Sequence, residues 1–110
     1  MNDDSSAAMN GNESVRIVAS ALLTHVGGLH ARPAIKVSQL AKRFQSRVWI
    51  ASSEEGPWVD AKSVARVIAM KAPSNMPVFF AAEGGDANDA LVALVGLVDS
   101  DFENGEAHVP

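Results

Sequence analysis

The 110-residue sequence contains no cysteine, which excludes disulfide bonds and thiolate metal ligands. The same absence suits a reducing compartment, so we expect a cytoplasmic protein. Basic residues are also scarce, because nine Lys and Arg stand against thirteen Asp and Glu and the formal net charge is −4. A chain with this balance has no basic field for a nucleic-acid backbone or an anionic membrane, and we expect neither as a partner.

Long hydrophobic runs are missing as well. The longest apolar runs, at residues 78–82 and 90–98, are too short or too interrupted to span a bilayer. Residues 1–13 have neither the basic flank nor the apolar core of a signal peptide, so we expect 1–14 to form a disordered leader. We expect 104–110 to be a loose tail, and the 15–103 segment between them to form one compact domain.

Hydrophobic periodicity predicts the elements of the first half of that domain. Apolar residues alternate with others from Val15 to Thr24, which indicates a half-buried strand. From Pro33 to Phe44 the spacing becomes helical and predicts an amphipathic helix. Its expected apolar face comprises Ile35, Val37, Leu40, Ala41 and Phe44. Residues 47–51 and 58–59 are β-rich and flank a turn, so they predict a hairpin.

The second half repeats this alternation of helix and strand. Residues 60–70 predict a short helix, 78–82 predict a strand, and Asp86 is expected to cap a final helix. The final helix carries one apolar stripe, formed by Leu91, Leu94, Val95, Val98 and Phe102. The order β-α-β-β-α-β-α predicts an α+β fold, a two-layer open-faced sandwich with a four-stranded antiparallel sheet covered on one face by three helices.

A glycine turn, Gly27-Gly28, links the first strand to the first helix and delivers His30 to the helix start. Pro33 suits the first turn of a helix, which places His30 at or beside the N-cap. The unpaired N–H groups of Ala31 and Arg32 then make a phosphate-binding helix start, and Arg32 adds a permanent positive charge.

Reversible phosphorylation of the His30 ring fits this setting, because a neutral imidazole is a nucleophile near pH 7 and phosphoryl transfer needs mainly positioning and neutralisation of charge. Two other interpretations stay open: a plain strand-to-helix turn, and a module that binds a free anion. A metal site is disfavoured, since His25, His30 and His108 lack ligand spacing. His25 is expected at the surface near a strand end and His108 in the tail. No Gly-x-Ser-x-Gly elbow supports a hydrolase.

The segment Gly28-Leu29-His30-Ala31-Arg32-Pro33 resembles the active-site signature of HPr, the family of histidine-containing phosphocarriers of the bacterial phosphoenolpyruvate-dependent phosphotransferase system. The resemblance covers residues 15–102 and includes Asp60-Ala61-Lys62-Ser63, which is similar to the family's regulatory serine segment. It implies a relay rather than an autonomous enzyme, without a cofactor or metal. His30 would accept a phosphoryl group on Nδ1 from enzyme I and pass it to an EIIA-type acceptor for sugar uptake or regulation, while Arg32 holds the phosphate.

The resemblance also implies a regulatory role for Ser63 as the target of an ATP-dependent HPr kinase/phosphorylase. The competing interpretation of Ser63 is an ordinary N-cap. Partner docking is expected at Val64, Val67, Ile68 and Lys42, although apolar helix residues also serve as core and a lysine also serves as a solvated surface. A relay that meets two partners in turn is expected to be a monomer. The alternative function is a mainly regulatory binding module controlled by phosphorylation.

Overall fold

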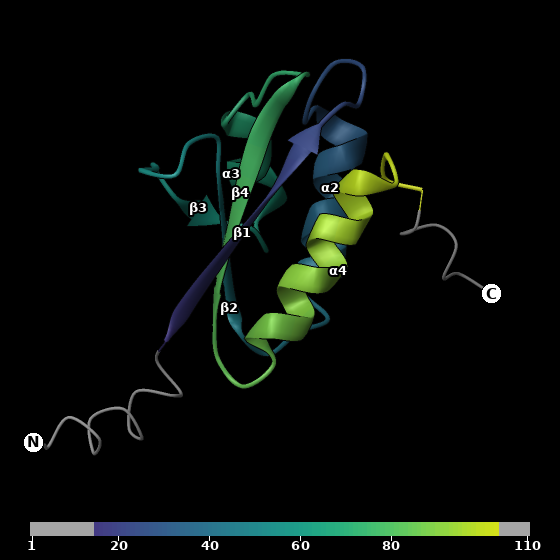
Figure 1. The fold of residues 1–110 in the computed structure, drawn as a ribbon. Helices are drawn as coiled ribbons and strands as arrows, with labels where there is room; N and C mark the ends of the chain where they lie inside the picture. Colours follow the sequence, from purple (N-terminus) through teal and green to yellow (C-terminus); the bar gives the residue numbers. More distant parts are fainter. Residues whose placement is uncertain (1–14, 104–110) are drawn as a thin grey trace, which may run out of the picture.

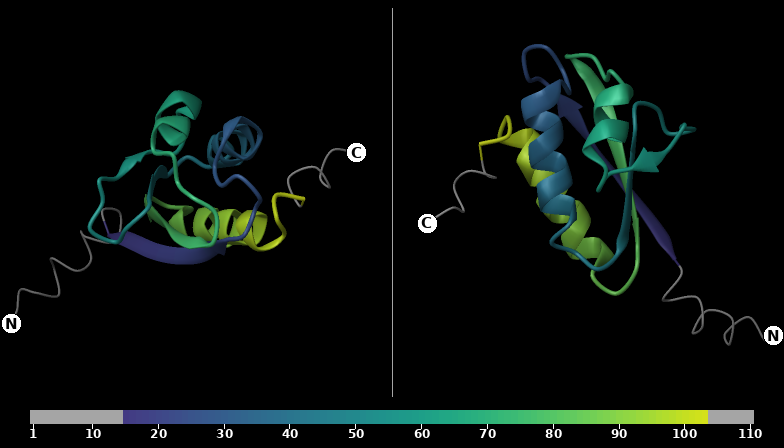
Figure 2. Two further views of the ribbon diagram at one scale, coloured as in Figure 1. Left: turned by 90° about the horizontal axis from the view of Figure 1, so that it is seen from above. Right: turned by 180° about the vertical axis from the view of Figure 1, so that it is seen from behind.

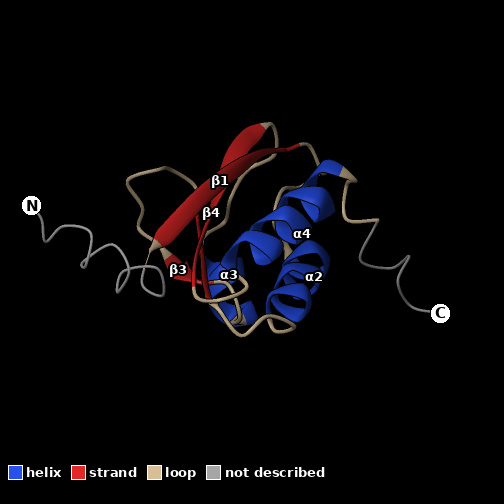
Figure 3. Ribbon diagram, turned by 60° about the horizontal axis from the view of Figure 1, so that its bottom comes forward, coloured by secondary structure: helices blue, strands red, loops and turns tan. Residues whose placement is uncertain are grey.

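The structure is a computed structural model that describes residues 15–103, so the expected leader and tail lie outside the described residues. Within that range the elements are β1 (Arg16–Leu23), α2 (Ala31–Ala41), β2 (Arg47–Ala51), β3 (Val59–Asp60), α3 (Val64–Ala69), β4 (Met76–Glu83) and α4 (Ala87–Asp99), as drawn in Figure 1. The strands form one antiparallel sheet in the order β1-β4-β2-β3. The helices lie together on one side of it (Figure 3), which confirms the predicted open-faced sandwich.

Strand β1 lies at an edge of the sheet and keeps the predicted alternation. Ala21 and Leu23 are buried, whereas Val18 and Leu22 are exposed on the opposite face. The core lies between the sheet and the helices, which share one side in both views of Figure 2. Its largest fully buried side chains come from both layers and include Leu23, Val37, Ile50, Phe80, Leu94 and Leu97.

Helix α2 begins and ends earlier than the periodicity predicts, and it is rotated about its axis. The expected core residue Ile35 is 41% exposed, so that assignment is wrong. The buried face instead consists of small or compact side chains, namely Pro33, Ala34, Val37, Ser38 and Ala41. Ser38 is tolerated there because its hydroxyl donates a 2.9 Å hydrogen bond to the Ala61 carbonyl oxygen. Small residues on this face let the helix backbone lie close to its neighbours.

One helix boundary and one side-chain role also differ from the prediction. Asp60 belongs to β3, so α3 begins only at Val64. Asp86 occupies the N-cap of α4, but its side chain makes no capping hydrogen bond. Its carboxylate instead accepts hydrogen bonds from the N–H groups of Gln45 and Ser46 and from the Ser46 hydroxyl. These contacts fasten the start of α4 to the chain just before β2.

Candidate functional site

The glycine turn is held against the segment that follows α3. Gly27 and Gly28 have φ angles of +87° and +71°, which few other residues adopt without strain. The Gly28 N–H donates to the His25 carbonyl oxygen at 2.9 Å, and the Leu29 N–H donates to the Ala72 carbonyl oxygen at 3.0 Å. These bonds fix the path of the chain into α2 and therefore the position of the next residue, His30.

His30 is the N-cap residue of α2, as the sequence predicts, and its backbone is extended. The side chain is exposed and makes no capping hydrogen bond. Among residues 15–103 no acceptor meets the N–H groups of Ala31 and Arg32, and Pro33 has no N–H. The positive end of the α2 dipole and two unpaired donors therefore lie directly beside an accessible imidazole.

The edge of the His30 ring that carries Nε2 lies against Gly27. A Cβ atom at Gly27 would be 2.8 Å from Cδ2 and 3.2 Å from Nε2 of His30. Nδ1 is on the opposite edge of an imidazole ring, away from this contact. The turn thus covers one ring nitrogen and leaves the other edge for chemistry, so the glycine at position 27 bears directly on the orientation of His30.

His25 also belongs to this site, although the sequence analysis assigned it only a surface position near a strand end. Its ring lies with its centroid 5.4 Å from that of His30, at an interplanar angle of 37°. Its Nδ1 lies 2.9 Å from Oδ1 of Asp101, and its ring meets Phe102 edge-on at 5.3 Å. No local pattern reveals this cluster, because Asp101 is 76 residues away in the chain.

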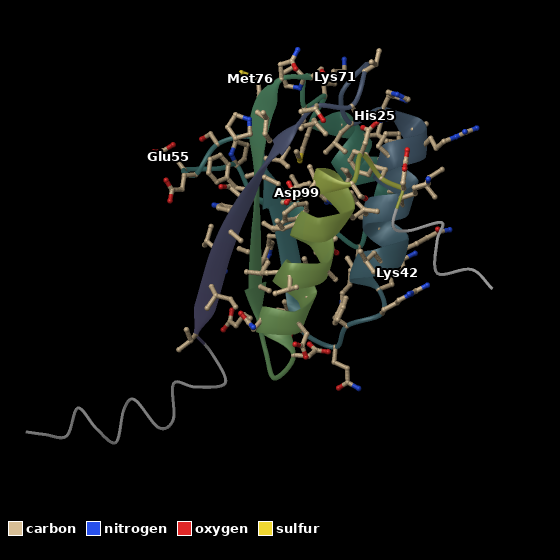
Figure 4. The ribbon with its side chains drawn as sticks, turned by 45° about the vertical axis from the view of Figure 1, so that its right-hand side comes forward. His25, Lys42, Glu55, Lys71, Met76 and Asp99 are labelled. Carbon is tan, nitrogen blue, oxygen red and sulfur yellow. The ribbon has the colours of Figure 1, made fainter. Side chains whose placement is uncertain are left out.

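The turn after α4 completes this end of the molecule. The Lys36 ammonium group donates a 2.9 Å hydrogen bond to the Phe102 carbonyl oxygen, which ties the turn to α2. A cavity of about 210 Å³ opens here, with Arg32 and Lys36 on one side and Asp101 on the other. In Figure 4, His25 lies between the start of α2 and this turn. Arg32 lines this cavity together with His25, and it makes no hydrogen bond or ion pair within the described part of the chain.

Ser63 is the N-cap residue of α3, and its hydroxyl oxygen accepts a 3.3 Å hydrogen bond from the Arg66 N–H. The neighbouring Lys62 ammonium group donates to the Phe44 carbonyl oxygen at 2.8 Å and so joins the start of α3 to the end of α2. The capping role is therefore present in the structure. It leaves the serine half-buried.

The expected docking residues divide into two groups. Val67 is fully buried in the core, so its assignment to partner docking is wrong. Ile68 is 37% exposed, Val64 is partly exposed and Lys42 is exposed, so these three can meet a partner. Ile35, which the sequence analysis placed in the core, adds an exposed apolar side chain on the neighbouring α2. The periodicity identified the apolar positions but could not say which ones face the solvent.

Within residues 15–103, no group of three or more His, Cys, Asp or Glu side chains could hold a metal ion. None of the helices in this range has the length and apolar character needed to cross a bilayer.

Comparisons with known proteins relate the whole domain to one family. A family model described as the PTS HPr component phosphorylation site matches residues 12–100. The phosphocarrier protein HPr of Cupriavidus necator is 39% identical over 79 residues, which are 72% of this chain and 86% of that protein. A multiphosphoryl transfer protein of Vibrio cholerae is 38% identical over 79 residues, 71% of this chain and 20% of that protein. The crystal structure of HPr-C-His from Thermoanaerobacter tengcongensis matches with a TM-score of 0.71 and 32% identity, covering 78% of this chain and 94% of that one.

Proposed function

The chain belongs to the HPr family, the phosphocarriers of the phosphotransferase system, and we propose that His30 is the residue that carries its phosphoryl group. Membership of this family implies that the protein exchanges phosphoryl groups with other proteins of the phosphotransferase system. We propose specifically that enzyme I, driven by phosphoenolpyruvate, is the donor and that an EIIA-type protein is the acceptor. The chain then acts as a relay with a phosphohistidine intermediate, not as an autonomous enzyme.

One observation carries this proposal: His30 is exposed at the N-cap of α2 and makes no capping hydrogen bond. Its ring nitrogen is free to attack phosphorus, so a P–N bond forms at Nδ1 as the bond from phosphorus to the donor breaks and the donor keeps that electron pair. The phosphoryl oxygens then lie near the N–H groups of Ala31 and Arg32 at the positive end of the helix. The reverse sequence of bond changes delivers the group to the acceptor.

Arg32 supports the same step through its charge. Its guanidinium group has no competing partner within residues 15–103 and is therefore available to the equatorial oxygens of the phosphoryl group. Such charge neutralisation is a main requirement of phosphoryl transfer. We propose Arg32 as the phosphate-stabilising residue.

We propose that partners dock on the exposed apolar side chains of the two neighbouring helices, Ile35 on α2 and Val64 and Ile68 on α3. Lys42 lies at the C-cap of α2 and is exposed, so its charge can attract an acidic partner surface. An apolar centre with a charged rim is typical of transient protein interfaces.

We propose Ser63 as a regulatory phosphorylation site for an HPr kinase/phosphorylase. A phosphate on this hydroxyl adds a charge of about −2 at the start of α3, next to Val64 and on the helix that also carries Ile68. That charge would repel an acidic partner and so reduce docking. If this control dominates, the protein is mainly a regulatory binding module, and phosphate then flows to no permease component.

We further propose that residues 15–103 form a single domain that works in the cytoplasm as a monomer. The absence of cysteine suits that compartment. A relay that meets a donor and an acceptor in turn needs His30 open to each of them, which a monomer provides.

The test is phosphorylation by enzyme I and phosphoenolpyruvate, with the site mapped by mass spectrometry. We expect an acid-labile, base-stable phosphate on His30 and no phosphate on the His30→Ala variant. His25→Ala is the matched control for the other histidine of the cluster, and it should keep a label on His30. A label retained by His30→Ala, or saturable binding of inorganic phosphate without a covalent label, would refute the assignment.

A further inference from the structure

His25 is held on three sides, and one of its contacts is His30. Because an ionised carboxylate only accepts hydrogen bonds, Nδ1 of His25 carries the proton that it shares with Asp101 across 2.9 Å. Phe102 packs against the same ring edge-on at 5.3 Å. The remaining side meets the His30 ring at 5.4 Å. The imidazole of His25 is therefore held in one orientation and packs against the ring of the proposed phosphorylation site, His30.

The residue that holds His25 occupies a backbone position that favours glycine. The Phe102 N–H donates to the Leu97 carbonyl oxygen and the Asp101 N–H to that of Val98, which is the Schellman pattern at the end of α4. Asp101 is the residue after the C-cap in this pattern and has a φ angle of +59°. Glycine would adopt that angle without strain. The backbone therefore gives no reason for a carboxylate here, whereas the contact with His25 does.

We propose that the Asp101–His25 pair is a positioning device for phosphoryl transfer at His30. This inference rests on the proposed function of His30. Gly27 limits the His30 ring at its Cδ2–Nε2 edge, and His25 limits it from a second side. Together they restrict rotation of the imidazole and keep Nδ1 aligned with the N–H groups at the start of α2. Such alignment speeds a transfer step, because the reacting atoms need not search for their geometry.

The decisive variant is Asp101→Gly, since it separates folding from function. Removing the side chain relieves the left-handed backbone angle, so the stability toward urea should equal or exceed that of the native protein. The rate of phosphorylation by enzyme I should nevertheless fall roughly tenfold, because His25 and then His30 lose their fixed orientation. The change should lie in kcat, with the apparent KM for this protein unchanged, because the proposed docking side chains are untouched.

Asp101→Asn is the conservative partner of that variant. Asparagine tolerates the left-handed angle, and its amide oxygen still accepts the hydrogen bond from Nδ1 of His25. It should restore a rate close to that of the native protein, although the negative charge is gone. A second route to the same loss is His25→Phe, which keeps an aromatic ring between His30 and Phe102 but cannot donate to Asp101. We expect it to be as slow as Asp101→Gly.

The ring nitrogens of His30 provide a readout that does not depend on turnover. Their ¹⁵N chemical shifts should differ from the native values in Asp101→Gly and remain native in Asp101→Asn. If native protein, Asp101→Gly and His25→Phe are labelled at equal rates, the positioning role is wrong and the proposed function stands. If Asp101→Asn is as slow as Asp101→Gly, the hydrogen bond is not the cause and the inference is overturned. No label on the native protein overturns both proposals.

Discussion

Gly28 lies against Ala72 so closely that a Cβ atom on the glycine would overlap the Ala72 carbonyl oxygen. The same oxygen accepts the 3.0 Å hydrogen bond from the Leu29 N–H, so it cannot move away without loss of that bond. The contact joins the turn before α2 to the segment after α3. It therefore links the position of His30 to the part of the chain that follows α3, the helix capped by the proposed regulatory residue Ser63.

We expect Gly28→Ala to destabilise the protein by roughly 2 kcal/mol or more, because the new Cβ meets backbone and the φ angle of +71° becomes strained. Urea unfolding gives the measurement. Gly85→Ala is the control, since a Cβ there meets nothing within 4 Å and its effect should stay within about 0.5 kcal/mol. Equal stabilities of the two variants would contradict the close approach of Gly28 and Ala72.

The local features of this fold could be predicted from the sequence because they depend on neighbouring residues. The alternation along β1 gave the buried face, and the order glycine, histidine and proline gave the start of α2 at His30. Ser63 was recognisable as a cap because its hydroxyl bonds to a residue three positions ahead. Each of these signals lies within one turn or one strand.

The remaining features depend on contacts between distant segments, which periodicity does not contain. Ile35 fits an apolar stripe as well as Val37 does, and only the packing of small residues against other elements turns it toward solvent. Asp86 looks like a helix cap, yet it bonds across 40 residues to Ser46. The pairing of His25 with Asp101 spans 76 residues. The sequence therefore predicted where the site lies but not that these two residues belong to it.

Arg32→Ala should slow phosphorylation of His30 by roughly 10- to 100-fold, because it removes the proposed charge-assisted contact with the phosphoryl group, which is worth about 1.5–3 kcal/mol. Stability should hardly change, since the Arg32 side chain is exposed. The initial rate with enzyme I and phosphoenolpyruvate is the measurement. Arg43→Ala removes an equal charge beyond the far end of α2 and serves as the control. If both variants slow the reaction equally, general attraction of the partner explains the effect and Arg32 has no specific role.

Substitutions at Ser63 separate its two roles. Ser63→Ala loses the hydrogen bond from the Arg66 N–H and should cost about 1 kcal/mol of stability while leaving phosphotransfer unchanged. Ser63→Asp keeps a capping oxygen and so keeps stability, but its negative charge at the start of the proposed docking helix should weaken docking and raise the apparent KM of enzyme I for this protein. Unfolding curves and steady-state rates are compared for both variants. Unchanged docking in Ser63→Asp would speak against a regulatory site here.

Asp86 makes the stability of the fold depend on pH. The Ser46 hydroxyl, together with the N–H groups of Gln45 and Ser46, lowers the pKa of this carboxyl group below its ordinary value of 3.8. A group with a lower pKa in the folded than in the unfolded state binds fewer protons when folded. Its stabilising contribution is therefore complete above the unfolded pKa and is lost as the pH falls through the folded pKa.

We accordingly expect Asp86→Asn to be less stable than the native protein at neutral pH, because an amide turns an N–H group toward one of these three donors. The difference should shrink as urea unfolding is repeated at successively lower pH, because the native carboxyl group then takes up a proton and loses its charge. Asp89→Asn removes the same charge in the first turn of α4 but none of these hydrogen bonds, so its difference from the native protein should be smaller and less dependent on pH. If the difference for Asp86→Asn stays constant as the pH falls, the loss of stability comes from the amide group itself and not from the loss of an ionised carboxylate. The hydrogen bonds of Asp86 to Gln45 and Ser46 would then not be the reason that the stability of the fold depends on pH.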